Sequence, residues 1–253
     1  MVRLKDTNDI KLMRVSGTIL ARTLRALAAM AQEGVTLSAL DARAKKMIRE
    51  AGAEPTFLGY TPEGAGKAYP AAICASVNET IVHGIPGKYA LKDGDILSID
   101  LGVTYEGRIT DAAVTVGIGK ISEEAKVLIS VTRRALDAAI KECVSGKHLG
   151  DIGFAVESVA KKAKFHVIHG LTGHGVGFEL HEDPSVYNYG TRGEGMKLVP
   201  GLVLAIEPMF STGSAYATVK RDDSFVTKDG SLSAHFEHSV LITESGPEVL
   251  TKE

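Results

Sequence analysis

The stretch LKDGDILSIDLG, residues 91–102, decides the fold, because its pattern returns later in the chain. Residues 198–209 read LVPGLVLAIEPM, and leucine, glycine, leucine, isoleucine and an acid recur in the same order. Each stretch has the apolar run of a buried strand, and each places a carboxylate, Asp100 or Glu207, directly after that run. Because carboxylates are costly to bury, both acids need a compensating partner.

The elements around the two stretches repeat as well. Apolar spacing and capping residues predict helices over residues 7–30, 36–51, 122–143 and 149–163, and strands follow each helical pair. The strands are expected within 71–78, 95–105, 108–119, 165–177, 201–210, 216–230 and 232–244. The order helix, helix, strands therefore occurs twice, as pseudo-repeats of about 7–119 and 120–250. We expect residues 1–253 to form a single α+β domain, with a ligand cleft between its two pseudo-symmetric halves.

Four acids stand in apolar strand segments of this kind: Asp100, Asp111, Glu207 and Glu237. The sequence YEGR, residues 105–108, predicts a hairpin turn between the first two, so both can point to one side of the hairpin. One such acid at a strand end would be an ordinary cap or surface residue. Four of them, two in equivalent places of a repeat, indicate a site that binds a cation.

Histidine supplies a softer ligand beside these acids. His174 lies in GHGVG, where flanking glycines allow close backbone packing. This motif lacks the spacing and the following helix of a dinucleotide-binding loop, and HEDPS, which begins at His181, lacks the second histidine of the helical zinc motif. Four carboxylates and one histidine favour two divalent transition-metal ions, which can activate a water molecule for hydrolysis.

The other histidines fall into two groups. His83 and His181 lie in polar, turn-rich segments, where an uncoordinated imidazole can donate a hydrogen bond to a developing oxyanion or to a scissile amide. Five further histidines have no such setting, and we interpret them as structural or surface residues: His148, His166, His169, His235 and His238.

The sequence resembles the methionine aminopeptidases, and in particular their short type I form. The resemblance covers nearly the whole chain and rests on the motifs SVNETIVHGIP, DGDILSIDLG, GHGVG, IEPM and SLSAHFEH. It implies the pita-bread fold, in which a curved antiparallel sheet carries helices on its outer face, and removal of the initiator methionine from nascent proteins. Type I is favoured because no cysteine-rich extension precedes the catalytic region and too few residues separate His174 from Glu207 for the type II insertion.

The same resemblance implies roles for individual residues. Asp100 would chelate one divalent ion, His174 and Glu207 the other, and Asp111 and Glu237 would bridge both; the ions would be Co, Mn, Fe or Zn. Glu207 would also shuttle a proton, His83 would contact the scissile amide, and His181 the tetrahedral oxyanion. The residues that would form the methionine pocket are Phe57, Tyr60, Tyr69 and Leu180, and those that would hold a monovalent cation are Asn78, Thr80 and Ser233.

The pocket departs from the family pattern. Four extra residues within 61–68 separate Tyr60 from Tyr69, Phe57 stands where bacterial relatives often have cysteine, and Leu180 where many have phenylalanine. The chain also has no tryptophan, although bacterial members often place one near the position of Asp223. We therefore expect a remodelled pocket rim that still accepts the adaptable thioether of methionine.

Composition excludes several classes of protein. A formal charge of −2 with no basic cluster argues against DNA, and no apolar stretch approaches the length of a spanning helix, so no membrane partner is expected. The two cysteines, Cys74 and Cys143, are too few for a disulfide framework and are interpreted as buried thiols. We expect a cytoplasmic monomer whose partners are N-terminal methionine peptides of nascent proteins and, as a further candidate, the ribosome.

Two alternatives remain open. A proline-specific peptidase of the Xaa-Pro type shares the fold, although such relatives usually carry a further N-terminal domain for which this chain leaves no room. A non-catalytic binding protein could also keep the fold, although proteins of that kind typically lose metal ligands, and all five candidate ligands are present here.

Overall fold

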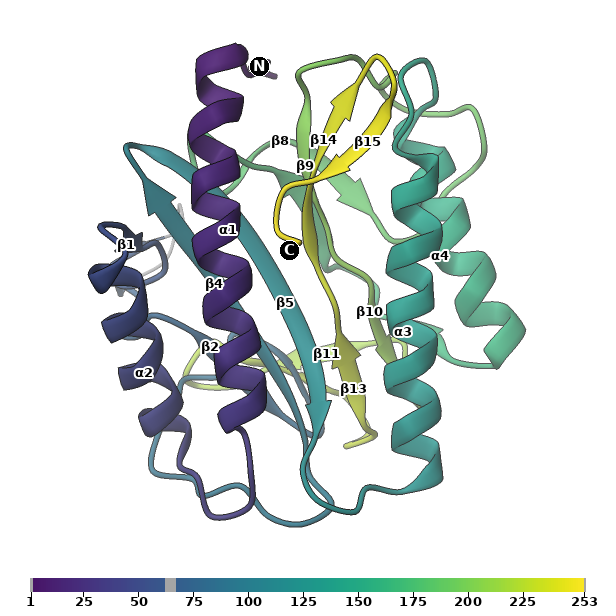
Figure 1. Cartoon of the computed structure of the whole chain (residues 1–253). Helices are drawn as coiled ribbons and strands as arrows, with labels where there is room; N and C mark the ends of the chain where they lie inside the picture. Colours follow the sequence, from purple (N-terminus) through teal and green to yellow (C-terminus); the bar gives the residue numbers. More distant parts are fainter. Residues whose placement is uncertain (1, 62–66, 253) are drawn as a thin grey trace.

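A computed structural model describes residues 2–61 and 67–252 of the chain (Figure 1). Within these residues the helices are α1 (Thr7–Met30), α2 (Leu37–Glu50), α3 (Glu123–Glu142) and α4 (Leu149–Ala163). The four predicted helices are confirmed, each within one residue at either end. Asp6, Thr36 and Ser122 accept backbone amides at the first turns of α1, α2 and α3, which explains where these helices begin.

All strand pairs in the described residues are antiparallel. The first half contributes β1 (Glu54–Pro55), β2 (Cys74–Val77), β3 (Thr80–Val82), β4 (Ile96–Tyr105) and β5 (Arg108–Gly117). The second half contributes β6 (His166–Val167), β7 (Thr172–Gly175), β8 (Glu182–Tyr187), β9 (Val203–Ile206), β10 (Met209–Ser211), β11 (Ala217–Val219), β12 (Phe225–Thr227), β13 (Ser233–His235), β14 (His238–Thr243) and β15 (Gly246–Val249).

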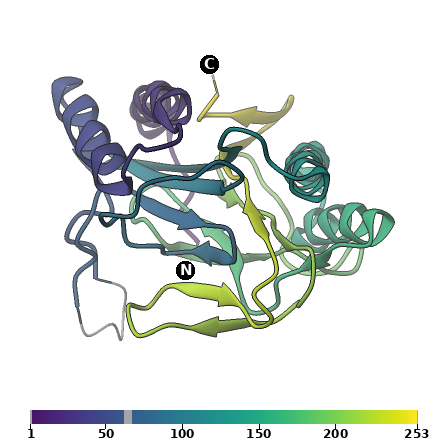
Figure 2. The same ribbon diagram turned by 90° about the horizontal axis from the view of Figure 1, so that it is seen from below.

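The helices gather on one side of the sheets, and the β11–β12 hairpin lies on the opposite side (Figure 2). In the first half, Leu97 and Ile99 of β4 pack into a buried cluster with apolar residues of α1 and α2. In the second half, Leu204 and Ile206 of β9 pack into a buried cluster with apolar residues of α3 and α4. Side chains alternate along a strand, so the next residues, Asp100 and Glu207, face away from the helices.

The two halves meet along β5 and β14. The backbone N–H of Asp111 donates to Oγ of Ser239 at 2.9 Å, and the Ser239 hydroxyl donates back to the Asp111 carbonyl oxygen at 2.9 Å. The N–H of Glu237 donates to the carbonyl oxygen of Ala113 at 2.9 Å. These bonds bring an acid of the second half beside the acids of the first.

The structure departs from the predicted strands in two ways. Four strands lie outside the predicted segments, namely β1, β3, β8 and β15. β3 is only three residues long, while β8 and β15 each contain a proline and lie at the two edges of a five-stranded sheet, where proline is tolerated. Segments 165–177, 201–210, 216–230 and 232–244 each form two strands. In 201–210 and 232–244 the two strands are separated only by Glu207–Pro208 and by Phe236 and Glu237.

The structure also bears on the state of the two cysteines and on membrane-spanning helices. Cys74 and Cys143 are both buried and free, as predicted. In the described residues, no helix is at once long enough and apolar enough to span a bilayer.

Candidate metal centre and active site

The β4–β5 hairpin places Asp100 and Asp111 on one face. Asp100 lies opposite Ala113, and Asp111 lies opposite Gly102, so the two acids occupy diagonal positions of the same face. The turn that sets this register has positive φ at Glu106 (45°) and Gly107 (74°), as a two-residue hairpin loop of this hand requires. The predicted hairpin turn at residues 105–108 is therefore confirmed.

His174 comes from β7, which packs between β8 and β9. Its neighbours must be glycine because the strands approach closely: a Cβ at Gly173 would lie 2.3 Å from the carbonyl oxygen of Ala205, and a Cβ at Gly175 would lie 2.2 Å from that of Asp183. Nδ1 of His174 donates to the carbonyl oxygen of Gly175 at 2.9 Å. This hydrogen bond leaves the lone pair of Nε2 available to a metal ion.

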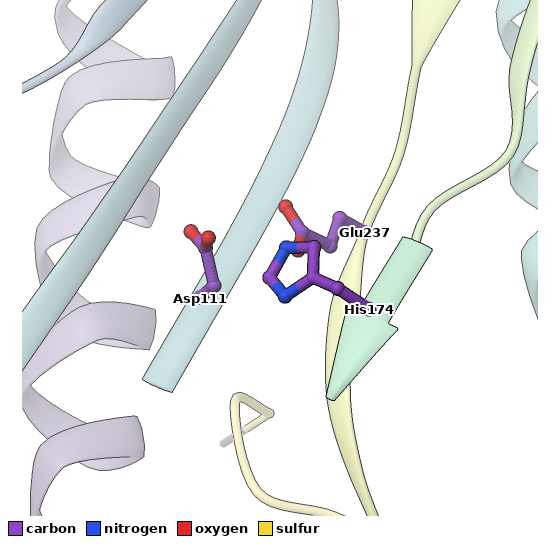
Figure 3. A group of neighbouring side chains, drawn as sticks. All are labelled: Asp111, His174 and Glu237. Atoms are coloured by element: carbon purple, nitrogen blue, oxygen red, sulfur yellow. The ribbon is translucent and has the colours of Figure 1, made fainter. Parts of the chain in front are cut away.

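Asp111, His174 and Glu237 converge from β5, β7 and the residue before β14 (Figure 3). One possible ligand atom from each lies within 4.8 Å of the others. Nε2 of His174 is also 3.4 Å from Oε1 of Glu207. The structure thus brings the predicted ligands of the two halves into one group.

Burial raises the pKa values of the four carboxyl groups, and repulsion between carboxylates adds to this effect. Burial, together with the nearby carboxylates of Asp111 and Glu207, raises the pKa of Asp100 well above its ordinary value. Burial and the carboxylate of Asp111 do the same to the pKa of Glu207, and the pKa values of Asp111 and Glu237 are also raised, mainly by burial. A divalent cation would relieve this repulsion and hold all four groups ionised.

Three carboxylate oxygens in this group are buried without a hydrogen-bond partner among the described residues. They are Oδ1 of Asp100, Oδ1 of Asp111 and Oε1 of Glu237. Buried oxygens of this kind are normally satisfied, so unsatisfied ones mark places where an ion or water is expected. Both the charge and the open lone pairs of these residues therefore fit divalent metal ions.

His83 and His181 line the same cleft as the candidate metal ligands, and both residues remain accessible to solvent. The ring of His181 packs edge-on against that of His174, with centroids 4.4 Å apart. Nδ1 of His181 and the hydroxyl of Tyr60 form a hydrogen bond of 2.7 Å. The ring of His83 lies edge-on to Phe225, with centroids 5.5 Å apart. His181 is thus held in the cleft by Tyr60 and by the candidate ligand His174, and His83 is held there by Phe225.

The cleft has a volume of about 1210 Å³ and contains every candidate metal ligand. One part of it is apolar: Phe57, Cys74 and Leu180 form a buried cluster, against which Tyr60 and Tyr69 pack. Phe57 and Tyr69 meet edge to face, with centroids 6.4 Å apart. The structure therefore brings together the four residues predicted for the methionine pocket and adds a buried thiol to them.

The rim of the cleft carries charged side chains near Asp223, a position for which the family resemblance implies tryptophan in bacterial members. Arg221, Asp222 and Asp223, in the turn between β11 and β12, line the cleft. Lys67 and Ala68, the last residues of the predicted 61–68 insertion, also line it, whereas residues 62–66 of that insertion lie outside the described part of the chain.

The residues predicted to hold a monovalent cation are partly engaged in other contacts. The side-chain amide of Asn78 donates to Asp95 at 2.9 Å, and its oxygen accepts the N–H of Ile96 at 3.0 Å. The carbonyl oxygen of Asn78 accepts the N–H of Ser233, and Oγ of Ser233 has no partner among the described residues. Asn78 and Ser233 are thus neighbours through their backbones, while Thr80 lies on β3.

His235 joins the site although its sequence context indicated a structural role. It is 2% exposed, and its Nε2 lies 3.5 Å from Oε2 of Glu207. Neither ring nitrogen has a hydrogen-bond partner among the described residues, and burial, with His83 and His174 nearby, lowers the pKa of His235 to about 3. Its position two residues before Glu237 was the available signal, because alternate residues of an extended chain share a face.

This chain is similar to known metallopeptidases over almost its whole length. Residues 11–244 match the model of metallopeptidase family M24. The chain is 44% identical to a methionine aminopeptidase of Clostridium perfringens over 99% of both chains, and 41% identical to methionine aminopeptidase 1 of Bacillus subtilis over the full length of both. A solved methionine aminopeptidase from Thermotoga maritima superposes with a TM-score of 0.96 at 43% identity, covering 100% of both chains.

The chain therefore belongs to metallopeptidase family M24 and, within it, to the type I methionine aminopeptidases. The expected pita-bread fold is confirmed by the same comparisons. A prolidase from Pyrococcus horikoshii is similar in fold alone, with a TM-score of 0.77 at 21% identity, and this chain covers 63% of its length.

Proposed function

We propose that this chain is a metal-dependent aminopeptidase that removes the N-terminal methionine from polypeptides by hydrolysing the first peptide bond. The observation that carries the proposal is the convergence of four buried carboxylates and His174 in one cleft, beside an apolar pocket. The membership in family M24 and the methionine aminopeptidase relatives support the same reaction.

Five residues would hold two divalent ions, which we propose to be Co, Mn, Fe or Zn: Asp100, Asp111, His174, Glu207 and Glu237. Bound ions of this kind lower the pKa of a water molecule and stabilise negative charge on the attacked carbonyl oxygen. The unpartnered oxygens of Asp100, Asp111 and Glu237 and the free lone pair of His174 Nε2 support this ligand set.

The remaining steps fall to side chains of the cleft. Glu207 would take the proton of the attacking water and pass it to the leaving amine, a role for which a carboxylate with a raised pKa is suited. His83 would donate to the scissile amide, and His181 to the carbonyl oxygen as it becomes negative. Phe57, Tyr60, Tyr69 and Leu180 would enclose the methionine side chain.

Several wider properties belong to the same proposal. The substrates would be N-terminal methionine peptides of nascent proteins, with the ribosome as a candidate docking partner, and the chain would act as a cytoplasmic monomer. Residues 1–253 would form one catalytic domain, composed of pseudo-repeats at about 7–119 and 120–250. Asn78, Thr80 and Ser233 would hold a monovalent cation. The unpartnered Oγ of Ser233 supports this site. The side chain of Asn78 is already hydrogen-bonded to Asp95, so fewer of its atoms are available as ligands.

The proposal is tested by metal-reconstituted hydrolysis. The protein is dialysed against a chelator, supplied separately with Mn²⁺, Co²⁺, Fe²⁺ and Zn²⁺, and incubated with the peptides Met-Ala-Ser and Ala-Pro-Ala. Release of methionine from the first peptide is expected with at least one metal. Preference for Ala-Pro-Ala would instead indicate an Xaa-Pro peptidase, and inactivity with all four metals would indicate a binding protein.

A further inference from the structure

The segment that precedes α1 carries a lysine whose charge is fully buried. The side chain of Lys5 is 0% exposed, and its ammonium group donates to the carboxylate of Glu182 and to the carbonyl oxygen of Arg3. The backbone N–H of Lys5 donates to the carbonyl oxygen of Gly201 at 2.8 Å. Burying an ammonium group costs free energy even when the group is paired, because it loses its hydration. The buried position of Lys5 therefore indicates a role other than that of a surface charge.

Glu182 connects this segment to the loop that carries His181. One carboxylate oxygen of Glu182 accepts from Lys5, and the other accepts the backbone N–H groups of Phe178 at 3.2 Å and Glu179 at 3.3 Å. The loop 177–181 lies between β7, which carries His174, and β8, which begins at Glu182. A single carboxylate therefore closes the loop on itself and attaches it to the N-terminal segment.

The ring of Phe178, within the same loop, is surrounded by three cations. The guanidinium carbons of Arg3 and Arg108 lie 4.5 Å and 4.7 Å from its centroid, and Nζ of Lys5 lies 5.0 Å from it. Arg108, the first residue of β5, donates in turn to Asp9 of α1 at 2.6 Å. These contacts hold Phe178, and with it the base of the loop, against the N-terminal segment and β5.

The stem of Lys5 also fills the space beside the loop. Gly177 has a φ of 141°, a value that L side chains rarely adopt, and a Cβ there would lie 2.4 Å from Cε of Lys5. The backbone of the loop is thus packed directly on the lysine. A change in Lys5 would be transmitted to Leu180 and His181 through backbone, rather than through flexible side chains.

We propose that the ion pair between Lys5 and Glu182 is a positioning element for catalysis, which holds the 177–181 loop so that His181 keeps its place in the cleft. The imidazole of His181 is adjacent in sequence to Glu182 and packs against His174 at one end of the loop. A displacement of about 1 Å in a catalytic group can cost about 100-fold in rate. This inference rests on the proposed function, because its effect is expressed through His181.

The test compares Lys5→Met, which keeps the apolar stem and removes the charge, with the wild-type protein on Met-Ala-Ser at saturating metal. We expect kcat to fall about 10- to 100-fold, with a smaller change in KM and unchanged metal content. Arg14→Met is the matched control: Arg14 also pairs with a distant glutamate, Glu248, at 2.7 Å, but on the surface between α1 and β15. It should retain wild-type kcat.

A second arm separates positioning from a merely structural role. Adding Lys5→Met to His181→Ala should lower kcat no further, because the group being positioned is already absent. Amide hydrogen exchange at Phe178 and Glu179 should also be faster in Lys5→Met, whereas exchange in α3 stays unchanged. Should Lys5→Met fail to fold, Lys5→Met/Glu182→Gln, which leaves no unpaired buried charge, takes its place in all comparisons.

The outcomes are distinguishable. An active wild-type protein with an equally active Lys5→Met variant would overturn the inference and leave the proposed function intact. A loss of kcat that is just as large in the His181→Ala background would also overturn it, since the effect would then not pass through His181. An inactive wild-type protein with every metal would overturn the proposed function itself.

Discussion

The two halves of the molecule build their parts of the site in different ways. In the first half, Asp100 and Asp111 lie on one continuous hairpin, and the register of β4 and β5 alone places them on the same face. In the second half, His174, Glu207 and Glu237 come from separate segments whose approach depends on how β7, β9 and β14 pair. One set of candidate ligands is therefore arranged locally, whereas the other needs the tertiary fold.

In the second half, the candidate ligands have supporting groups from neighbouring residues. His235 stands beside Glu207, and the backbone carbonyl oxygen of Gly175 accepts the Nδ1–H of His174. Asp100 and Asp111 interact with each other instead, since each contributes to the pKa of the other. Substitutions in the first half should therefore act directly on metal binding, and substitutions in the second half should separate metal binding from catalysis.

The largest effect is expected for Asp111→Asn in the hairpin. This change removes one negative charge and one unpartnered oxygen from the group that also contains His174 and Glu237. Metal affinity, measured by equilibrium dialysis, should fall by more than about 100-fold, which is the upper end of what loss of a supporting residue costs. Asp137→Asn, on the exposed surface of α3, is the control. Full metal occupancy in Asp111→Asn would show that the hairpin acids are not ligands.

A large effect on catalysis alone is expected for His181→Ala in the second half. The loss of a donor to the developing oxyanion should lower kcat about 100- to 1000-fold. Metal content, measured by atomic emission, should match that of the wild-type protein, because Nε2 of His174 and the carboxylates remain. His166→Ala, which removes an exposed histidine on β6, should have no effect. Loss of metal from His181→Ala would contradict the separation of roles between the two regions.

An intermediate effect on metal binding is expected for His235→Leu. Without the imidazole next to Oε2 of Glu207, the orientation of this ligand is less restricted, and metal affinity should fall about 10- to 100-fold. His235→Gln retains a side-chain N–H donor and should recover most of the affinity. If calorimetric titration shows the same affinity for His235→Leu and wild type, His235 does not support Glu207.

The smallest effect is expected in the apolar pocket, for Leu180→Ala. Loss of apolar contact with the methionine side chain should lower kcat/KM for Met-Ala-Ser about 10-fold, near the lower limit for a change of one or more methylene groups in a pocket. The expected change is mainly in KM. Leu180→Met preserves the volume and should behave like wild type. A fall in kcat of Leu180→Ala as large as that of His181→Ala would mean that the loop, rather than the pocket, had been disturbed.

Much of the fold follows from local patterns in the chain. The helices were predictable because apolar spacing and capping residues such as Thr36 and Ser122 act within a few residues of one another. The same holds for the β4–β5 hairpin, whose turn residues are adjacent. The strands β8 and β15 were missed because proline and short length weaken the periodic signal, and only their pairing with neighbours at the sheet edges makes them strands.

The site was predictable in part for the same reason. The repeated pattern that ends at Asp100 and Glu207 indicated buried acids, since an apolar run followed by a carboxylate is unusual without a cation. His235 was assigned a structural role because its contact with Glu207 joins residues from different strands. The ion pair of Lys5 with Glu182 could not be predicted either, because it links residues at the two ends of a long stretch of chain.

The sequence by itself determined the helices, the hairpin, the internal repeat and the residue types that can bind metal, because each depends on neighbours along the chain or on side-chain chemistry. The tertiary structure decided which of these residues meet. Hydrogen bonds between β5 and residues 237–239 bring Glu237 beside Asp111, and the packing of the N-terminal segment places Lys5 against Glu182, next to His181. Contacts between distant segments depend on the whole fold and therefore cannot be predicted from a local sequence pattern.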